Sequence, residues 1–105
     1  MKIAFVISNM NKLELGDCLS HANAFYIYQD DKELFYTLRL QSSISKHNKS
    51  KQFSAYLREN GVSIVVALDF GPKAKAFLDE QGIKWHNADN NTSFEDIISI
   101  IKKNN

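Results

Sequence analysis

The sequence predicts an α/β protein whose mixed β-sheet has helices on both faces. Three observations support this fold class: two unbroken apolar runs of strand length, an alternating apolar segment between them, and three later segments with the apolar spacing of helices. The predicted order of elements is βββαβαβα, which ends in two strand–helix units. Because no internal repeat or linker interrupts this order, we expect residues 1–105 to form a single domain.

Two central strands are expected at residues 3–7 and 62–68. Both segments are continuously apolar and rich in β-branched or aromatic residues, which is typical of strands covered on both faces. Ser8 and Asn9 are expected to end the first strand, and a long polar loop follows at 9–23.

A hairpin is expected at residues 24–28 and 34–40. Both segments are rich in strand-forming residues, and four charged residues at 30–33 separate them. The second segment alternates, with one face made of Leu34, Tyr36, Leu38 and Leu40. This alternation predicts an outer strand of the sheet.

The three helices have recognisable starts or ends. The first is expected at 48–60, because Gly61 follows its apolar stripe. The second begins at Pro72, since the fixed φ and missing N–H of proline suit the first helical position. A short strand follows at 83–85, and the residues at 92–95 have the spacing of a capping box ahead of the third helix.

Composition excludes several classes of function. Thirteen Lys and Arg against twelve Asp and Glu give a net charge of +1, which lacks the strong field of a general nucleic-acid or membrane-surface binder. The apolar runs are too short to cross a bilayer, and no cleavage signal opens the chain, so we expect a cytoplasmic protein. A single cysteine excludes an internal disulfide.

One edge of the predicted sheet collects four loops, at 9–23, 41–48, 68–72 and 86–92. Open α/β sheets bind ligands at the carboxyl ends of their parallel strands, which lie at this edge. The single cysteine and all three histidines fall in or beside these loops: Cys18, His21, His47 and His86. We therefore expect any binding site at this edge.

Four stretches of the chain resemble a known family. They are Met1-Lys2-Ile3-Ala4, the segment from Gly61-Val62 to Gly71-Pro72-Lys73-Ala74, Gly82-Ile83-Lys84, and the isoleucine-rich final helix. Over nearly its whole length the sequence is similar to the dinitrogenase iron-molybdenum cofactor biosynthesis family of nitrogenase accessory factor-like proteins. The resemblance implies a ribonuclease H-like three-layer fold with a five-stranded sheet of order 3-2-1-4-5. It also implies a role in carrying or inserting iron-sulfur or iron-molybdenum clusters.

The resemblance also implies where metal ligands lie. When Ala22 and Phe25 are aligned with the family's small residue and aromatic residue, Cys18 falls at the position of the family's cluster-associated histidine, and His21 replaces an arginine. A thiolate is a better ligand than imidazole for iron-sulfur clusters, so we expect Cys18 and His21 to be the metal ligands. The alternatives are an inert, buried Cys18 or a lost site.

A pocket around these ligands is expected from the ends of the two central strands. Its predicted cofactor-binding residues are Ser8, Asn9, Met10, Asp69, Phe70, Gly71 and His86. The helix start at Gly71 could hold an anionic cluster or phosphate, or be a plain strand-to-helix turn. The family's glycine-rich stretch is reduced here to Gly71, which narrows the room for a cluster. A basic segment with Lys46, His47, Lys49 and Lys51 could attract the same anion or be a solvated loop.

Enzymatic activity is not expected. Asp17, Asp69 and Asp89 could meet at the loop edge, but the first strand lacks the carboxylates of a two-metal nuclease. The sequence also lacks a Walker loop, a dinucleotide fingerprint and a nucleophile elbow.

The predicted function is therefore non-enzymatic, transient carriage of a cluster or its precursor between donor and acceptor proteins. The alternative is an interaction or regulatory module that kept the fold and lost the cluster site, and a third hypothesis is binding of a small anion at Gly71. The expected state is a monomer or a weak homodimer, with neither nucleic acid nor membrane as a partner.

Overall fold

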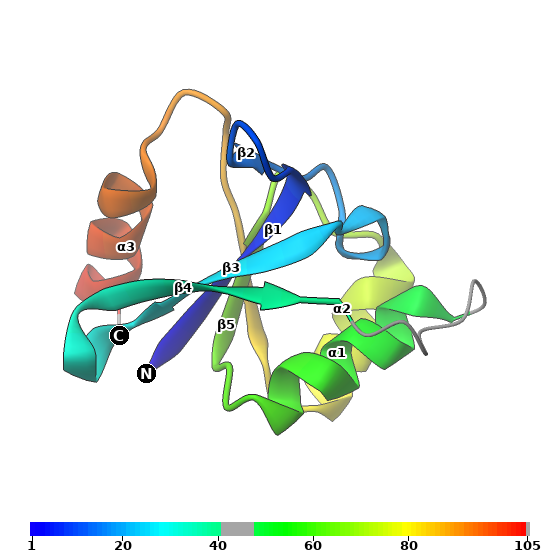
Figure 1. The fold of residues 1–105 in the computed structure, drawn as a ribbon. Coiled ribbons are helices and arrows are strands. Elements are labelled where there is room, and N and C mark those ends of the chain that lie inside the picture. The colour runs from blue at the N-terminus through cyan, green and yellow to red at the C-terminus, as the bar shows by residue number, and fades with distance from the viewer. Residues whose placement is uncertain (41–47, 105) are drawn as a thin grey trace.

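The computed structural model describes residues 1–40 and 48–104, which form one mixed sheet between helices (Figure 1). The strands are β1 (Lys2–Asn9), β2 (Glu14–Leu15), β3 (Ala24–Gln29), β4 (Leu34–Arg39), β5 (Ile64–Ala67) and β6 (Lys84–Asn87). The helices are α1 (Lys49–Glu59), α2 (Pro72–Glu80) and α3 (Phe94–Lys103), with short 3-10 turns η1 (Leu19–His21) and η2 (Asp30–Lys32). No helix in these described residues has the length and apolarity needed to span a membrane.

The sheet has the order β4-β3-β1-β5-β6, with β2 paired to β1 outside this path. The order of the five longer strands is the expected one, and β1 pairs antiparallel with β3 and parallel with β5. The remaining strand, β2, was not expected. Because β5 pairs with β1 only from Ile3 to Phe5, the same edge of β1 is free further on and pairs with β2 at Ile7 and Asn9. Ser8 and Asn9 therefore extend β1, contrary to the prediction that they end it.

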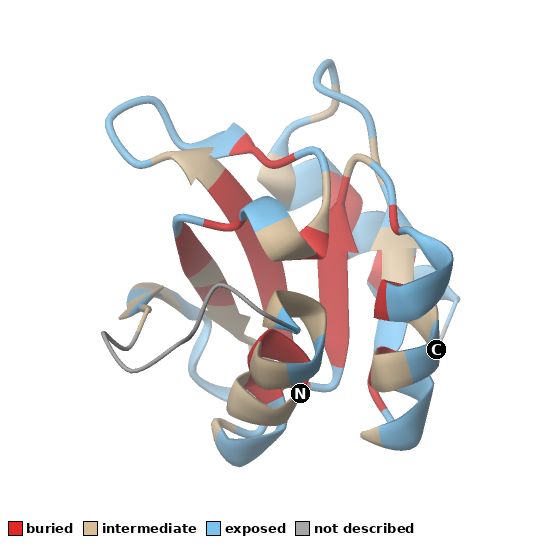
Figure 2. Cartoon of the chain, turned by 90° about the vertical axis from the view of Figure 1, so that its right-hand side faces the viewer, coloured by how far each residue is buried: buried red, intermediate tan, exposed pale blue. Residues whose placement is uncertain are grey.

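The central strand β1 is buried on both faces, as its apolar run predicts. Its alternate side chains Ala4 and Val6 belong to a core shared with α1 and α2, whereas Phe5 and Ile7 belong to a core shared with α3. Figure 2 shows the buried residues concentrated along the central strands. Successive side chains of a strand point to opposite faces, so one apolar run supplies both cores.

The hairpin places β4 at the edge of the sheet, as predicted for an outer strand. Tyr36 and Leu38 pack against the α1/α2 core, and Phe35 packs against the α3 core. Tyr26 of β3 stacks on Phe35, with ring centroids 4.8 Å apart. Each face of this outer strand therefore packs against one of the two cores.

The helix starts confirm two predictions and correct a third. The helix α1 lies within the expected range, and α2 begins at Pro72 as predicted. The helix α3, however, is capped by Ser93, whose Oγ accepts a hydrogen bond from Asp96 N at 3.1 Å. Thr92, the first residue of the capping box expected at 92–95, instead donates its hydroxyl hydrogen to Asp89 Oδ1 at 2.8 Å.

Two predicted loops need comment. The short strand extends to Asn87, so His86 lies within β6 and not in the loop expected at 86–92. Of the loop expected at 41–48, residues 41–47 lie outside the described residues, with Lys46 and His47 among them.

Candidate functional site

The segment between β2 and β3 lies against the connection from β5 to α2. Leu68 N donates to Gly16 O and Asp69 N donates to Asp17 O, both at 3.0 Å. These bonds hold residues 16 and 17 at the carboxyl ends of the parallel strands, the edge at which ligands were expected.

Gly16 allows the chain to pass close to β1. Its N–H donates to Val6 O at 2.7 Å, and a Cβ at this position would lie 2.7 Å from Cγ1 of the fully buried Val6. Such a contact is shorter than a Cβ tolerates, so any other residue would force Val6 or the backbone to shift, which favours glycine at this position. The close approach determines where Asp17 and Cys18 emerge from the sheet.

The turn η1 then orients the cysteine and the histidine. His21 N donates to Cys18 O at 3.2 Å, and Ala22 N donates to Leu19 O at 3.3 Å. Because a 3-10 turn has three residues per turn, residues 18 and 21 lie on the same side of it. Leu19 points into the core and is fully buried, which anchors the turn.

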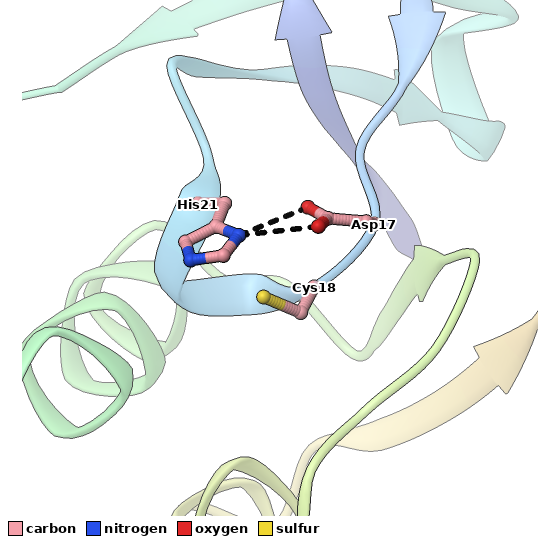
Figure 3. Close-up of side chains that lie close together, drawn as sticks. All are labelled: Asp17, Cys18 and His21. Carbon is pink, nitrogen blue, oxygen red and sulfur yellow. Dashed lines mark hydrogen bonds and ion pairs between the residues drawn. The ribbon is translucent and has the colours of Figure 1, made fainter.

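Asp17, Cys18 and His21 come together as a consequence (Figure 3). One potential ligand atom from each residue lies within 4.8 Å of the other two. The Asp17 carboxylate accepts a hydrogen bond from His21 Nδ1, which lies 3.2 Å from both of its oxygens. This bond lowers the pKa of Asp17 below its usual value of 3.8. Cys18 Sγ is partly buried and lies 3.4 Å from Ser20 Oγ.

Two open grooves adjoin this cluster. One has a volume of about 570 Å³ and is lined by Cys18, Ser20, Ser50, Gly71, Pro72 and Lys73, among others. The second, of about 380 Å³, is lined by His21, Lys49 and Phe77, and shares Ser20, Ser50 and Lys73 with the first. The N-terminal ends of α1 and α2 both reach these grooves. The positive dipole ends of the two helices, together with Lys49 and Lys73, place positive charge along the grooves, which favours anionic ligands.

Three of the expected cofactor-binding residues follow β5. Gly71 lines the larger groove and caps α2. Asp69 Oδ1 accepts hydrogen bonds from Phe70 N at 2.8 Å and from Asn87 Nδ2 at 3.2 Å. The Phe70 side chain is only 3% exposed and lies in the α1/α2 core. Of these three residues, Gly71 alone contributes to the groove beside Cys18.

Three further expected binding residues surround the end of β1. Ser8 Oγ donates to Glu14 O at 3.4 Å, and Asn9 Oδ1 accepts from Asn11 N at 3.0 Å. Met10 is 38% exposed. These residues do not line the two grooves beside Cys18 and His21.

His86 lies on the face of the sheet that packs against α3. It pairs with Val66 of β5, whose side chain belongs to the α3 core, and adjacent residues in paired strands share a face. It lines a separate cavity of about 200 Å³ with Trp85 and Ile101, among others. The structure therefore does not bring His86 together with Cys18.

Asp17 is the member of the cluster that the sequence did not single out as a ligand. In the sequence, Asp17 stands out only as one of three possible nuclease carboxylates, with Asp69 and Asp89. The available signal was its position directly before Cys18 and four residues before His21. That signal acquires meaning only once the turn η1 and the Gly16 contact are known.

Comparisons with known proteins agree with this architecture. No curated protein sequence matches the chain. The apo form of the orange protein from Desulfovibrio gigas has a similar fold, with a TM-score of 0.81 and 15% identity, covering 98% of this chain and 88% of that one. A NifB-like protein from Thermotoga gives a TM-score of 0.74 and 19% identity, covering 96% and 87% of the two chains. The family model described as dinitrogenase iron-molybdenum cofactor matches residues 1–104. The chain therefore belongs to the dinitrogenase iron-molybdenum cofactor family.

Proposed function

We propose that this protein binds an iron-sulfur or iron-molybdenum cluster, or a precursor of one, as cargo beside Cys18 and His21. The observation that supports this most directly is the position of Cys18 on the wall of an open groove of about 570 Å³, with the imidazole of His21 nearby. Family membership supports a cluster-related role.

The ligand count favours a carrier over a permanent holder. Iron-sulfur clusters are usually held by four thiolates, and this chain has one cysteine. The terminal positions that Cys18 and His21 leave open would be filled by non-bridging sulfide or by side chains of the donor and acceptor proteins. A cluster held in this way can leave as well as arrive, so binding without catalysis is the proposed activity.

The charge of the grooves suits such cargo. Lys49 and Lys73 line the smaller groove, and the N-terminal ends of α1 and α2 adjoin it. Thiometallates and thiolate-bound clusters carry net negative charge, which these groups attract without a covalent bond. The electrostatic contribution adds to ligation by Cys18.

The test is anaerobic reconstitution with iron and sulfide, and separately with tetrathiomolybdate, followed by visible absorption and metal analysis. We expect stoichiometric colour in the natural protein and its loss in Cys18→Ser. The matched control is Cys18→Ser/Ser99→Cys, which keeps one thiol but moves it to the exposed Ser99 on α3. Circular dichroism shows that each variant is folded.

Two results would contradict the proposal. Undiminished colour in Cys18→Ser would show that the thiol is not a ligand. A natural protein that stays colourless in both reconstitutions would exclude cluster carriage and favour the interaction module, with binding of a small anion at Gly71 as the other hypothesis.

A further inference from the structure

We infer that Asp17, Cys18 and His21 together bind a single first-row divalent ion such as Zn²⁺, without sulfide and without a partner protein. The inference rests on the proposed metal-binding role of Cys18 and His21. It adds Asp17 as the third ligand and names a mononuclear ion as a species that the chain can hold by itself.

The spacing of Asp17 and His21 fits an ion. A tetrahedral zinc ion with bonds of about 2.0 Å to nitrogen and oxygen separates these two ligand atoms by about 3.3 Å. His21 Nδ1 lies 3.2 Å from each oxygen of the Asp17 carboxylate, so both ligands already stand at this separation. An ion between them would replace the Nδ1 proton that now makes the hydrogen bond to the Asp17 carboxylate.

Cys18 needs only a small movement to join them. Its Sγ lies within 4.8 Å of one ring nitrogen of His21 and one carboxylate oxygen of Asp17, against about 3.5 Å between sulfur and nitrogen ligands of one tetrahedral zinc ion. The side chain is only partly buried and is not part of either hydrophobic core. Figure 3 shows the sulfur and the imidazole on the same side of the turn, with the carboxylate facing the ring.

The donor set selects the class of ion. One thiolate, one imidazole and one carboxylate suit zinc, cobalt(II) and iron(II), whereas Mg²⁺ and Ca²⁺ prefer oxygen ligands alone. Within residues 1–40 and 48–104, no fourth His, Cys, Asp or Glu joins the three. Three protein ligands leave one position of a tetrahedral ion open to water or to an incoming sulfur ligand.

The backbone of the site is held in place before an ion binds. Asp17 O accepts from Asp69 N, the preceding Gly16 is bonded to β1, and the buried Leu19 anchors the turn. Ligands on a fixed backbone lose little conformational entropy on binding. The alternative role for Asp17 is to orient His21, which would then bind the ion through Nε2.

The test is titration of the full chain with Co²⁺ under anaerobic, sulfide-free conditions. We expect one ion per chain, a thiolate-to-cobalt charge-transfer band, d–d bands of tetrahedral intensity, and displacement by Zn²⁺ but not by Mg²⁺. Cys18→Ser should remove the charge-transfer band. Asp17→Asn should weaken binding at least about tenfold. The matched control Asp31→Asn removes an exposed carboxylate elsewhere and should leave binding unchanged.

A second measurement separates ligation by Asp17 from orientation of His21. The ¹⁵N shifts of the His21 ring in the Zn²⁺ form report which nitrogen binds the metal, and we expect Nδ1. Metallation of Nε2 with Nδ1 still protonated would show that Asp17 only orients the ring, and would overturn its assignment as a ligand.

The outcomes distinguish this inference from the proposed function. Cluster loading without tight Co²⁺ binding, or equal affinities in Asp17→Asn and Asp31→Asn, would overturn the mononuclear site and leave cluster carriage standing. Co²⁺ binding that depends on Asp17 and Cys18, in a protein that fails both reconstitutions, would support the ion site and exclude cluster carriage.

Discussion

At the scale of single residues, Gly16 determines the position of the candidate site. The neighbouring Asp17 and Cys18 can leave the sheet where they do because no side chain separates residue 16 from β1. The candidate metal-binding cluster therefore depends on a residue that has no side-chain ligand atom of its own.

Gly16→Ala is expected to lower the free energy of unfolding by about 1–3 kcal/mol, the usual cost of adding a methyl group to a tightly packed position. The reason is the 2.7 Å approach of the new Cβ to Val6 Cγ1. Denaturant unfolding measures the change. Gly71→Ala is the comparison, because nothing lies within 4 Å of a Cβ at that position, so that any loss there comes from the N-cap of α2 and not from a clash.

A double-mutant cycle checks the cause. In a Val6→Ala background Cγ1 is absent, so Gly16→Ala should cost less than in the natural protein. An equal cost in both backgrounds would show that the contact with Val6 is not responsible.

At the scale of elements, the start of α3 shows how a hydroxyl is chosen as a cap. Thr92 and Ser93 are adjacent and both can cap a helix, but Ser93 accepts from Asp96 N while Thr92 donates to Asp89. Glu95 and Asp96 in the first turn, and Lys102 and Lys103 in the last, complement the helix dipole.

Ser93→Ala is expected to lower the free energy of unfolding by about 1 kcal/mol, since the N–H of Asp96 loses its acceptor. Thr92→Ala should have a smaller effect on the helix. Thermal unfolding of both variants, followed by circular dichroism, makes the comparison. A larger loss in Thr92→Ala would assign the cap to Thr92.

At the scale of the whole molecule, an ion pair joins two elements that are distant in sequence. Lys102 Nζ near the end of α3 lies 2.9 Å from Asp30 Oδ1 in η2, the turn between β3 and β4. Their hydrogen bond lowers the pKa of Asp30 below 3.8 and raises the pKa of Lys102 above 10.5. The pair links α3 to the turn between β3 and β4.

The pH dependence of this pair has a defined sign. The lowered pKa of Asp30 means that its contribution to stability is present above pH 3.8 and is lost as the pH falls through the folded-state pKa. The raised pKa of Lys102 means that its contribution is lost as the pH rises above 10.5. We therefore expect Asp30→Asn to be less stable than the natural protein between these limits and equal to it in stronger acid.

Thermal unfolding across the acid range measures this difference, with Asp31→Asn as the control of equal charge. Asp31 lies in the same turn and is exposed. A difference between Asp30→Asn and the natural protein that persists unchanged in strong acid would exclude the ion pair as its source.

The layers of the fold could be predicted because their signals are local. The apolar run in β1 indicates burial on both faces, and Pro72 indicates the start of α2. The strand β2 could not be predicted in this way. Its two residues can pair with β1 only because the pairing of β5 with the same edge of β1 ends at Phe5. Where that pairing ends depends on how the strands of the sheet assemble.

The candidate site was predictable in part for the same reason. Cys18 and His21 stand three apart, so any single turn places them together, and the structure confirms that they adjoin. His86 was expected beside them but faces α3, because the register of β6 against β5 decides its face. A shift of one residue in that register would have reversed the outcome.

The sequence by itself therefore determined the fold class, the starts of α1 and α2, and the three-residue spacing of one thiol and one imidazole. Only the tertiary structure decided that Asp17 completes the cluster, that β2 extends the sheet and that His86 lies on the opposite face. Hydrophobic period and turn chemistry act over a few neighbouring residues and are visible in the sequence. The meeting of distant segments depends on strand register and on close backbone contacts, such as that of Gly16 with Val6, which form only when the whole sheet assembles.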